Sequence, residues 1–307
     1  MIVVVGSINM DMTLQVPSHP LRGEVVQGSD YTLHPGGRGA NQAVAVARAG
    51  SAVRLIGKVG IDVFADTLLD SLAASGVDIH AVQRVARPSG VAFINVTADG
   101  ETSITVSPGA NAALQPQDLD AELFRDARVV LVQLEIPAET ALHALALGQS
   151  AGAVNVMHLT PGHAFETTEL HDVDVLIASR EDAALLRGVP EQADPPALIE
   201  ALHSYAPQVI LTVGSDGVWW SSGNDQGHID AFRVTPVDTT AASDAFAGAF
   251  AAALEGERPL ADAARFGAAA AALAVLCEGA QEAMPHRESI EELLLDEEVA
   301  AGVSSGE

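Results

Sequence analysis

The stretch from Asp238 to Gly248 combines an acidic side chain with the start of a helix. It reads Asp-Thr-Thr-Ala-Ala-Ser-Asp-Ala-Phe-Ala-Gly, and small residues at 241–243 let another group approach the backbone. Free N–H groups in the first turn of a helix carry partial positive charge and bind phosphate. With Asp244 beside them, the stretch could hold a phosphate while the carboxylate takes a proton from a hydroxyl. The same residues also fit an N-cap ahead of an alanine-rich core helix.

Further polar residues follow predicted strands. Asn9 and Asp11 come after the apolar run Ile2–Val5, and Glu135 comes after Val129–Val132. Ligands bind beyond the carboxyl ends of strands in open α/β sheets, so these side chains are candidates for a binding site. Locally, the first pair also fits an Asx turn, and Glu135 also fits a helix cap.

The glycine-rich turn at 35–41 opens a predicted helix. It resembles a dinucleotide fingerprint, but it does not directly follow a buried strand, and Gln42 stands at the third glycine position. Two interpretations remain. Either the turn serves only to start the helix, or its backbone, which glycines leave uncovered by side chains, contacts a polyhydroxy ligand together with Asn41.

Several other kinds of chemistry are disfavoured. The sequence has no Walker A motif, no Gly-x-Ser-x-Gly elbow, and no pair of its ten histidines at metal-ligand spacing beside a carboxylate. Cys277 is the only cysteine, so neither a disulfide framework nor a thiolate cluster is expected.

The elements that must hold these residues alternate between strand and helix. Such alternation predicts an α/β fold with a doubly wound, mostly parallel sheet and helices on both faces. The predicted strands are 2–5, 53–59, 129–132, 154–158, 173–178 and 209–213, and the predicted helices are 42–49, 64–74, 140–150, 180–186, 244–254, 260–276 and 289–295. No long linker is evident, so one domain over residues 1–307 is expected.

Two extended regions interrupt this alternation. Residues 12–32 form short apolar stretches broken by proline and glycine, and residues 89–106 contain the hairpin signal Asp99-Gly100. We expect them to form a small β-sheet that stands off the main body.

The chain of 307 residues carries a formal net charge of −26. Such a surface repels nucleic acid and anionic membranes, so neither is expected as a partner. The apolar start, Met1–Val5, lacks a basic region and is too short for a signal sequence or a membrane span, which favours a cytoplasmic protein.

These motifs together resemble the PfkB carbohydrate kinase family, and its ribokinase subgroup in particular. The resemblance covers nearly the whole chain and depends on five stretches: Gly6–Asp11, Pro35–Ala45, Ser107–Ala112, Val132–Glu135 and Asp238–Asp244. It implies ATP-dependent transfer of phosphate to the 5-hydroxyl of D-ribose, with magnesium and with potassium as an activator. Alternatives are a kinase for another sugar or a nucleoside, or a catalytically impaired sugar-binding relative.

The resemblance also implies roles for individual residues. Asp244 would be the general base, beside an anion hole formed by the backbone N–H groups of Ala241, Ala242 and Ser243. The sugar would be held by Asn9, Asp11, Gly37, Arg38, Asn41, Glu135 and Asp244. The nucleotide would contact His158, Ser179, Thr212, Gly214, Ser215, Gly217, Ser243 and Ala268.

Metals and assembly follow from the same resemblance. A monovalent cation would be bound by Asp238, Thr240, Ala274, Cys277, Gly279 and Ala283, largely through carbonyl groups, and Asp182 would hold magnesium through water. The segments 12–32 and 89–106 would form a β-lid that also joins two copies into a homodimer.

The residues expected on the sugar side match the family pattern, whereas several on the phosphate side depart from it. Ser243 stands where the family has glycine, and its Cβ is expected to resist a positive φ and to crowd the phosphate. The other departures are Arg38, His158, Ser179, Asp182 and Ala247. The sequence therefore supports sugar binding more directly than rapid turnover.

Overall fold

The computed structural model describes residues 1–159, 170–188 and 193–304. Its main body is built on a nine-stranded sheet in the order β13-β12-β11-β10-β9-β8-β1-β4-β5. The strands are β1 (Ile2–Val5), β4 (Val53–Gly60), β5 (Val82–Val85), β8 (Val129–Gln133), β9 (Val154–His158), β10 (Val175–Ser179), β11 (Gln208–Thr212), β12 (Val218–Ser222) and β13 (Asp225–Ile229). In this order, all strands from β11 across to β5 run parallel. Strand β12 is antiparallel to β11, and β13 is antiparallel to β12.

Helices cover both faces of this sheet. They are α1 (Arg38–Arg48), α2 (Ala65–Ala74), α3 (Ala138–Ala151), α4 (Arg180–Arg187), α5 (Pro195–Leu202), α6 (Ala242–Glu255), α7 (Leu260–Ala274) and α8 (Arg287–Ser304). Ile2 and Val4 belong to a core that includes residues of α1, α2, α6, α7 and α8. Val3 and Val5 belong to a second core with residues of α3, α4 and α5. The doubly wound fold predicted from the sequence is therefore confirmed, because successive side chains of a strand point to opposite faces.

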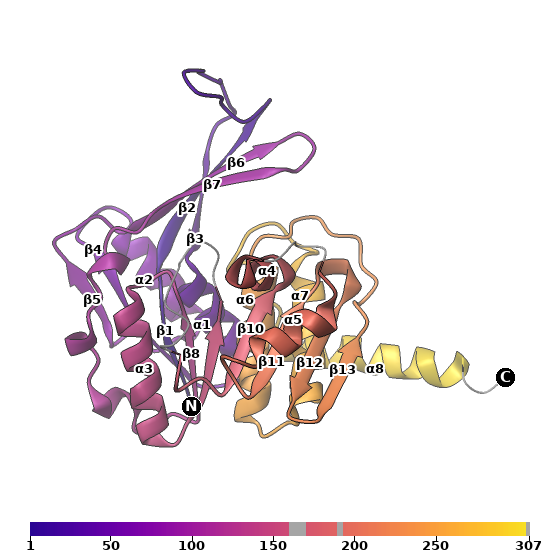
Figure 1. The fold of residues 1–307 in the computed structure, drawn as a ribbon. Coiled ribbons are helices and arrows are strands. Elements are labelled where there is room, and N and C mark those ends of the chain that lie inside the picture. Colours follow the sequence, from indigo (N-terminus) through magenta and orange to yellow (C-terminus); the bar gives the residue numbers. More distant parts are fainter. Residues whose placement is uncertain (160–169, 189–192, 305–307) are drawn as a thin grey trace.

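A second sheet of four strands projects from this body (Figure 1). It contains β2 (Asn9–Val16), β3 (Thr32–Gly36), β6 (Gly90–Thr97) and β7 (Thr102–Ser107), in the order β3-β2-β6-β7. Asn9 and Asp11 therefore lie inside β2 and not in a turn at the end of β1. The chain leaves the main sheet after Val5 and enters the small sheet at Asn9.

Some elements have no clear signal in the sequence. The edge strands β5 and β13 are short and partly polar, and α5 begins at two prolines. Short 3-10 turns are η1 (Asn111–Ala113), η2 (Pro116–Asp118), η3 (Ala121–Phe124) and η5 (Gly214–Asp216). Helix α8 extends away from the body toward the C-terminus (Figure 1). In the described part of the chain, no helix has the length and apolar character needed to span a membrane.

Candidate active site

The predicted site residues converge where the small sheet joins the body, near the N-terminus of α1. Glycines allow this close approach. A Cβ on Gly39 would lie 2.6 Å from the carbonyl carbon of Gly6, and one on Gly37 would lie 2.6 Å from the Asn9 nitrogen. Gly37 also has a φ of 90°, which a residue with a side chain rarely adopts. The glycine turn therefore packs the start of α1 against the segment that joins β1 to β2.

Asp244 is buried, with 4% of its surface exposed, and α1 supplies its partners. Gln42 Nε2 donates to Asp244 Oδ1 at 2.8 Å, and Asn41 Nδ2 donates to Oδ2 at 3.2 Å. Arg38 Nε lies 3.2 Å from Oδ1. Because residues 38, 41 and 42 share one face of a helix, all three side chains reach the same carboxylate. The position of Asp244 is thus set by the packing of α1 against α6.

The sugar-side candidates lie next to Asp244. Burial, together with the charges of Glu135, Asp244 and Glu282, raises the pKa of Asp11 to about 7. Ser7 Oγ donates to Glu135 Oε2 at 2.6 Å. The buried Asn41 Oδ1 has no hydrogen-bond partner among the described residues. These acceptors suit a ligand that carries several hydroxyl groups.

Asn9 is held in one orientation by a neighbouring asparagine. Asn111 Nδ2 donates to Asn9 Oδ1 at 2.7 Å, and Asn111 Oδ1 accepts from the backbone N–H of Ile8 at 3.0 Å. The oxygen of Asn9 is therefore occupied, and its amide nitrogen is the group left to donate to a ligand.

On the phosphate side, the chain turns sharply into α6. Ala241 has a φ of 58°, whereas Ser243 lies inside the first turn of the helix. The expectation that Ser243 would be strained by a positive φ is wrong, because Ala241 adopts the left-handed conformation instead. The N–H of Ala242 donates to Thr239 O at 3.3 Å, and no hydrogen bond is described for the N–H of Ala241 or Ser243.

A hollow of about 340 Å³ opens beside this turn. Its lining residues are Arg38, His158, Ser179, Glu181, Asp182, Leu185 and Ser243. Arg38 Nη2 lies 3.0 Å from His158 Nε2 and donates to Ser243 Oγ at 3.2 Å. Arg38, predicted to contact sugar, thus lies between Asp244 and this hollow.

The charges in the hollow are set by burial. Burial and the Arg38 charge lower the pKa of His158 well below its usual value, so this imidazole is neutral. Burial raises the pKa of Asp182, whose Oδ1 has no partner among the described residues. Ser179 Oγ accepts from the Asp182 N–H at 3.0 Å and caps α4. Asp182 thus presents a free, buried oxygen, the kind of donor that suits a hard cation or its bound water.

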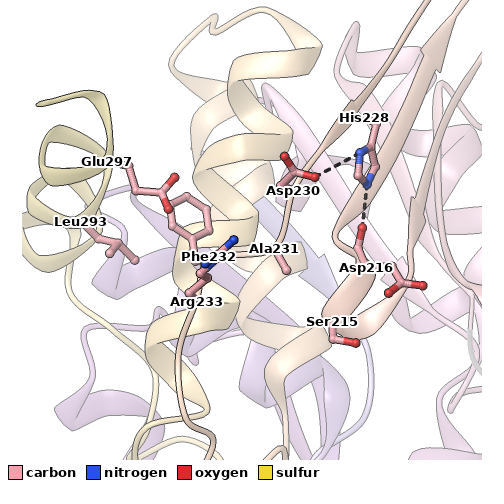
Figure 2. A pocket seen from close by; sticks show the side chains of 9 residues that line it. All are labelled: Ser215, Asp216, His228, Asp230, Ala231, Phe232, Arg233, Leu293 and Glu297. Carbon is pink, nitrogen blue, oxygen red and sulfur yellow. Dashed lines mark hydrogen bonds and ion pairs between the residues drawn. The ribbon is translucent and has the colours of Figure 1, made fainter. Parts of the chain in front are cut away.

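The remaining nucleotide candidates lie along the adjacent strand end. Thr212 pairs with Ser179 in the sheet, and Gly214, Ser215 and Gly217 follow it. Ser215 and Asp216 line a second hollow of about 750 Å³ (Figure 2). Its other lining residues are His228 of β13, residues 230–233 that follow this strand, and Leu293 and Glu297 of α8. Arg180, which follows Ser179 in the sequence, has its Nη2 3.9 Å from Asp216 Oδ2 of the second hollow. Ala268 is buried in α7 and lines neither hollow.

The candidate cation ligands lie in two adjoining segments. Asp238 accepts from the Thr240 N–H at 2.9 Å and from the Gly279 N–H at 3.0 Å. Val237 also donates to Val275 O at 2.7 Å. Although burial acts in the opposite direction, the bonds from Thr240 and Gly279 lower the pKa of Asp238. Such a carboxylate suits a cation that prefers oxygen ligands. Of the other candidates, Ala274 and Ala283 are buried and Cys277 is exposed.

Four residues of this site had no role assigned from the sequence: Ser7, Gln42, Asn111 and Gln133. The spacing of Gln42 to Arg38, four residues along a predicted helix, is a signal that could have revealed its place beside Asp244. The contacts of Gln133 and Asn111 span 91 and 102 residues of chain, and no local pattern encodes them.

A buried carboxylate in the first turn of a helix is an arrangement suited to transfer of phosphate to a hydroxyl, since the helix N-terminus can bind the anion and the carboxylate can take the proton. The model of the pfkB family carbohydrate kinases matches residues 1–287. A ribokinase of Bacillus subtilis is 38% identical over 296 residues, which cover 95% of this chain and 99% of that protein. A deoxyribokinase of Salmonella typhi is 34% identical over 259 residues, covering 81% and 84%.

A solved structure of Arabidopsis thaliana ribokinase complexed with ribose and ATP superposes with a TM-score of 0.87. It is 30% identical and covers 95% of this chain and 98% of the other. This chain belongs to the pfkB family of carbohydrate kinases, as its motifs predicted.

Proposed function

We propose that this protein phosphorylates D-ribose at the 5-hydroxyl with ATP, giving ribose 5-phosphate and ADP. The observation that carries the proposal is the position of Asp244, in the first turn of α6 and close enough to Asp11 for its charge to raise the pKa of that carboxyl. The ribokinases among its relatives support ribose as the acceptor.

The sugar binds at the base of the small sheet. Asp11 and Glu135 each accept hydrogen bonds from hydroxyl groups, and a carboxylate can accept from two neighbouring hydroxyls of a furanose. Asn9 donates through its nitrogen, and Asn41 accepts through its free oxygen. The backbone at Gly37 forms one wall of the site.

Asp244 acts as the general base. It takes the proton of the 5-hydroxyl while that oxygen bonds to the γ-phosphorus and the bond from phosphorus to the β,γ-bridging oxygen breaks. The first turn of α6, with the N–H groups of Ala241 to Ser243, and the Arg38 guanidinium stabilise the charge on the transferring phosphate.

The nucleotide lies along the ends of β10 and β11. Its phosphates occupy the hollow lined by His158, Ser179 and Ser243, and its nucleoside lies near the 212–217 turn, toward Ala268. Asp182 would hold magnesium through water, and this ion, when bound, neutralises charge on the phosphate oxygens.

A monovalent cation, potassium in our proposal, binds beside Asp238, which accepts hydrogen bonds from the N–H groups of Thr240 and Gly279. Its ligands would be oxygens of Asp238, Thr240, Ala274, Cys277, Gly279 and Ala283, most of them carbonyls. When bound, the ion supplies positive charge next to the loop that leads into α6. We expect turnover to depend on potassium for this reason.

The small sheet acts as a lid and as a dimer contact. Phe93 and Leu33, on the face opposite Asp11, are 46% and 41% exposed. Both are aligned with Met12 of β2, so the three side chains form one apolar row across the sheet. A second copy of the sheet would cover this row, because an apolar face of this kind is unfavourable in water.

A second candidate is the same chemistry on 2-deoxyribose, which the similarity to a deoxyribokinase favours. Coupled assays of ADP release with ribose, 2-deoxyribose, other sugars and nucleosides, each with and without potassium, separate the two. We expect the highest kcat/KM with ribose. ADP release that none of these acceptors stimulates would refute the kinase function.

The variant Asp244→Asn tests the role of the general base, because it keeps the size of the side chain but removes its charge. Loss of the general base should lower kcat by about 10²- to 10⁴-fold. Ribose binding, followed by calorimetry, should persist because the other sugar contacts remain. Turnover close to that of the wild type would disprove the role of Asp244.

A further inference from the structure

Two buried glutamines form a chain of hydrogen bonds behind Asp244. Gln42 of α1 and Gln133 at the end of β8 are both 0% exposed. Gln133 Nε2 donates to Gln42 Oε1 at 2.5 Å, and Gln42 Nε2 donates to Asp244 Oδ1 at 2.8 Å. The chain thus connects the main sheet, α1 and the first turn of α6. Neither glutamine lines a described hollow.

The chain fixes the orientation of Gln42. Because its oxygen accepts from Gln133, its nitrogen must face the carboxylate. A flipped Gln42 amide would bring its oxygen against the Asp244 oxygen and its N–H₂ against that of Gln133. Both contacts would be repulsive, and both would be buried, where an unpaired polar group is costly.

Gln42 also touches the histidine of the phosphate hollow. Its Nε2 lies 3.0 Å from His158 Nδ1, and Arg38 Nη2 lies 3.2 Å from the same nitrogen. Two donors facing this imidazole favour a neutral ring that can accept. Gln42 therefore connects the base with the wall of the hollow that we assign to phosphate.

We infer that Gln42 and Gln133 are positioning residues, which hold the Asp244 carboxylate in the orientation that accepts the sugar proton. The inference rests on the proposed function, since Asp244 must be the base. Gln42 acts on Asp244 directly, and Gln133 acts only through Gln42. Other charged or titratable groups near Asp244 are Arg38, His158 and Asp11. His158 is the cross-strand neighbour of Gln133, but the one side-chain hydrogen bond described for Gln133 goes to Gln42.

The test compares Gln42→Met, Gln133→Met and the double variant, since methionine fills a similar space without hydrogen bonding. With ribose, ATP, magnesium and potassium, we expect Gln42→Met to lower kcat by about ten- to a hundredfold, because small misplacements of a reacting group are costly. Ribose affinity from calorimetry should change little. Gln133→Met should lower kcat by a smaller factor.

The double variant distinguishes positioning from a general loss of packing. If Gln133 acts only through Gln42, the double variant should be no slower than Gln42→Met, whereas independent effects would multiply. Asn155→Leu is the control: Asn155 is a buried amide on β9, bonded to Leu145 O and Asp172 O. It should lower the melting temperature but leave kcat unchanged.

Each outcome has a distinct meaning. Wild-type kcat in Gln42→Met, or losses that multiply in the double variant, would overturn the inference and leave the kinase function intact. A wild-type protein that phosphorylates none of the acceptors would refute the proposed function and the inference with it. If Gln42→Met does not fold, Gln133→Met decides: its kcat must fall while its ribose affinity is kept.

Discussion

Asp11 is a carboxyl group whose charge depends on its neighbours. Burial, together with Glu135, Asp244 and Glu282, raises its pKa to about 7. These three carboxylates come from three different parts of the chain, so the effect belongs to the assembled site. Near neutral pH, Asp11 is therefore only partly ionised before a sugar binds. Hydroxyl groups that donate to it should favour the charged form.

Ribose binding should accordingly release a proton from Asp11. If donation from the sugar lowers the pKa of Asp11 below about 7, affinity rises with pH, by at most about tenfold per unit, and levels off above that value. Calorimetry at pH 6 in buffers of different ionisation enthalpy measures the number of protons released when ribose binds. Asp11→Asn should bind ribose weakly and release none. An affinity that stays constant between pH 5 and pH 8 would contradict this assignment.

At the scale of elements, the crossing of α1 and α6 determines the geometry of the base. Gly248 of α6 faces α1 so closely that a Cβ would lie 2.5 Å from Ala45 Cβ and 2.6 Å from Gln42 O. The distance between Asp244 and its three donors on α1 thus depends on a missing side chain. Glycine is otherwise unfavourable inside a helix, by about 1 kcal/mol relative to alanine.

Gly248→Ala should separate the two helices. We expect the free energy of unfolding to fall by about 1–3 kcal/mol through overpacking. Turnover should fall as well, because Gln42 and Asp244 move apart. The control is Gly256→Ala at the end of the same helix, where a Cβ would meet only atoms at 3.4 Å or beyond. Denaturant unfolding and steady-state kinetics are measured for both variants. If Gly248→Ala and Gly256→Ala lower the free energy of unfolding and kcat equally, this explanation is wrong.

At the scale of the whole molecule, the small sheet stands off from the body. It projects from it (Figure 1) and exposes apolar residues on both faces. Ile104, which pairs with Ile94 and shares the face of Asp11, is 57% exposed, and Phe93 lies on the other face. In the proposed function the face that bears Asp11 covers the sugar, which leaves the opposite face for the proposed contact with a second copy.

Phe93→Glu should therefore give a monomer. A charge in the apolar row would be desolvated without a partner on association, which is costly. Sedimentation measures the change from the dimer that we propose for the wild type. Leu295→Glu is the control, because Leu295 is 61% exposed on the distant helix α8 and this change adds the same charge. A monomeric wild type, or a Phe93→Glu variant that stays dimeric, would exclude this face as the contact.

The sequence alone determined the fold class and most of the elements. The run Ile2–Val5 is short and β-branched, which favours a strand, whereas the alanine-rich stretch Ala242–Glu255 is longer than a typical strand and favours a helix. The identity of the family also followed from the sequence, because short motifs at 35–45 and 238–244 are local. Edge strands such as β13 have polar residues and one exposed face, so their pattern is weak.

Only the tertiary structure decided how the site is supported. It moved the left-handed conformation from Ser243 to Ala241, and it brought Arg38 to the base and the phosphate hollow. It also joined Gln133 to Gln42 across 91 residues of chain. Sequence patterns report local periodicity, whereas these contacts depend on how closely elements pack. Here that packing is set by glycines whose missing side chains let α1 approach its neighbours.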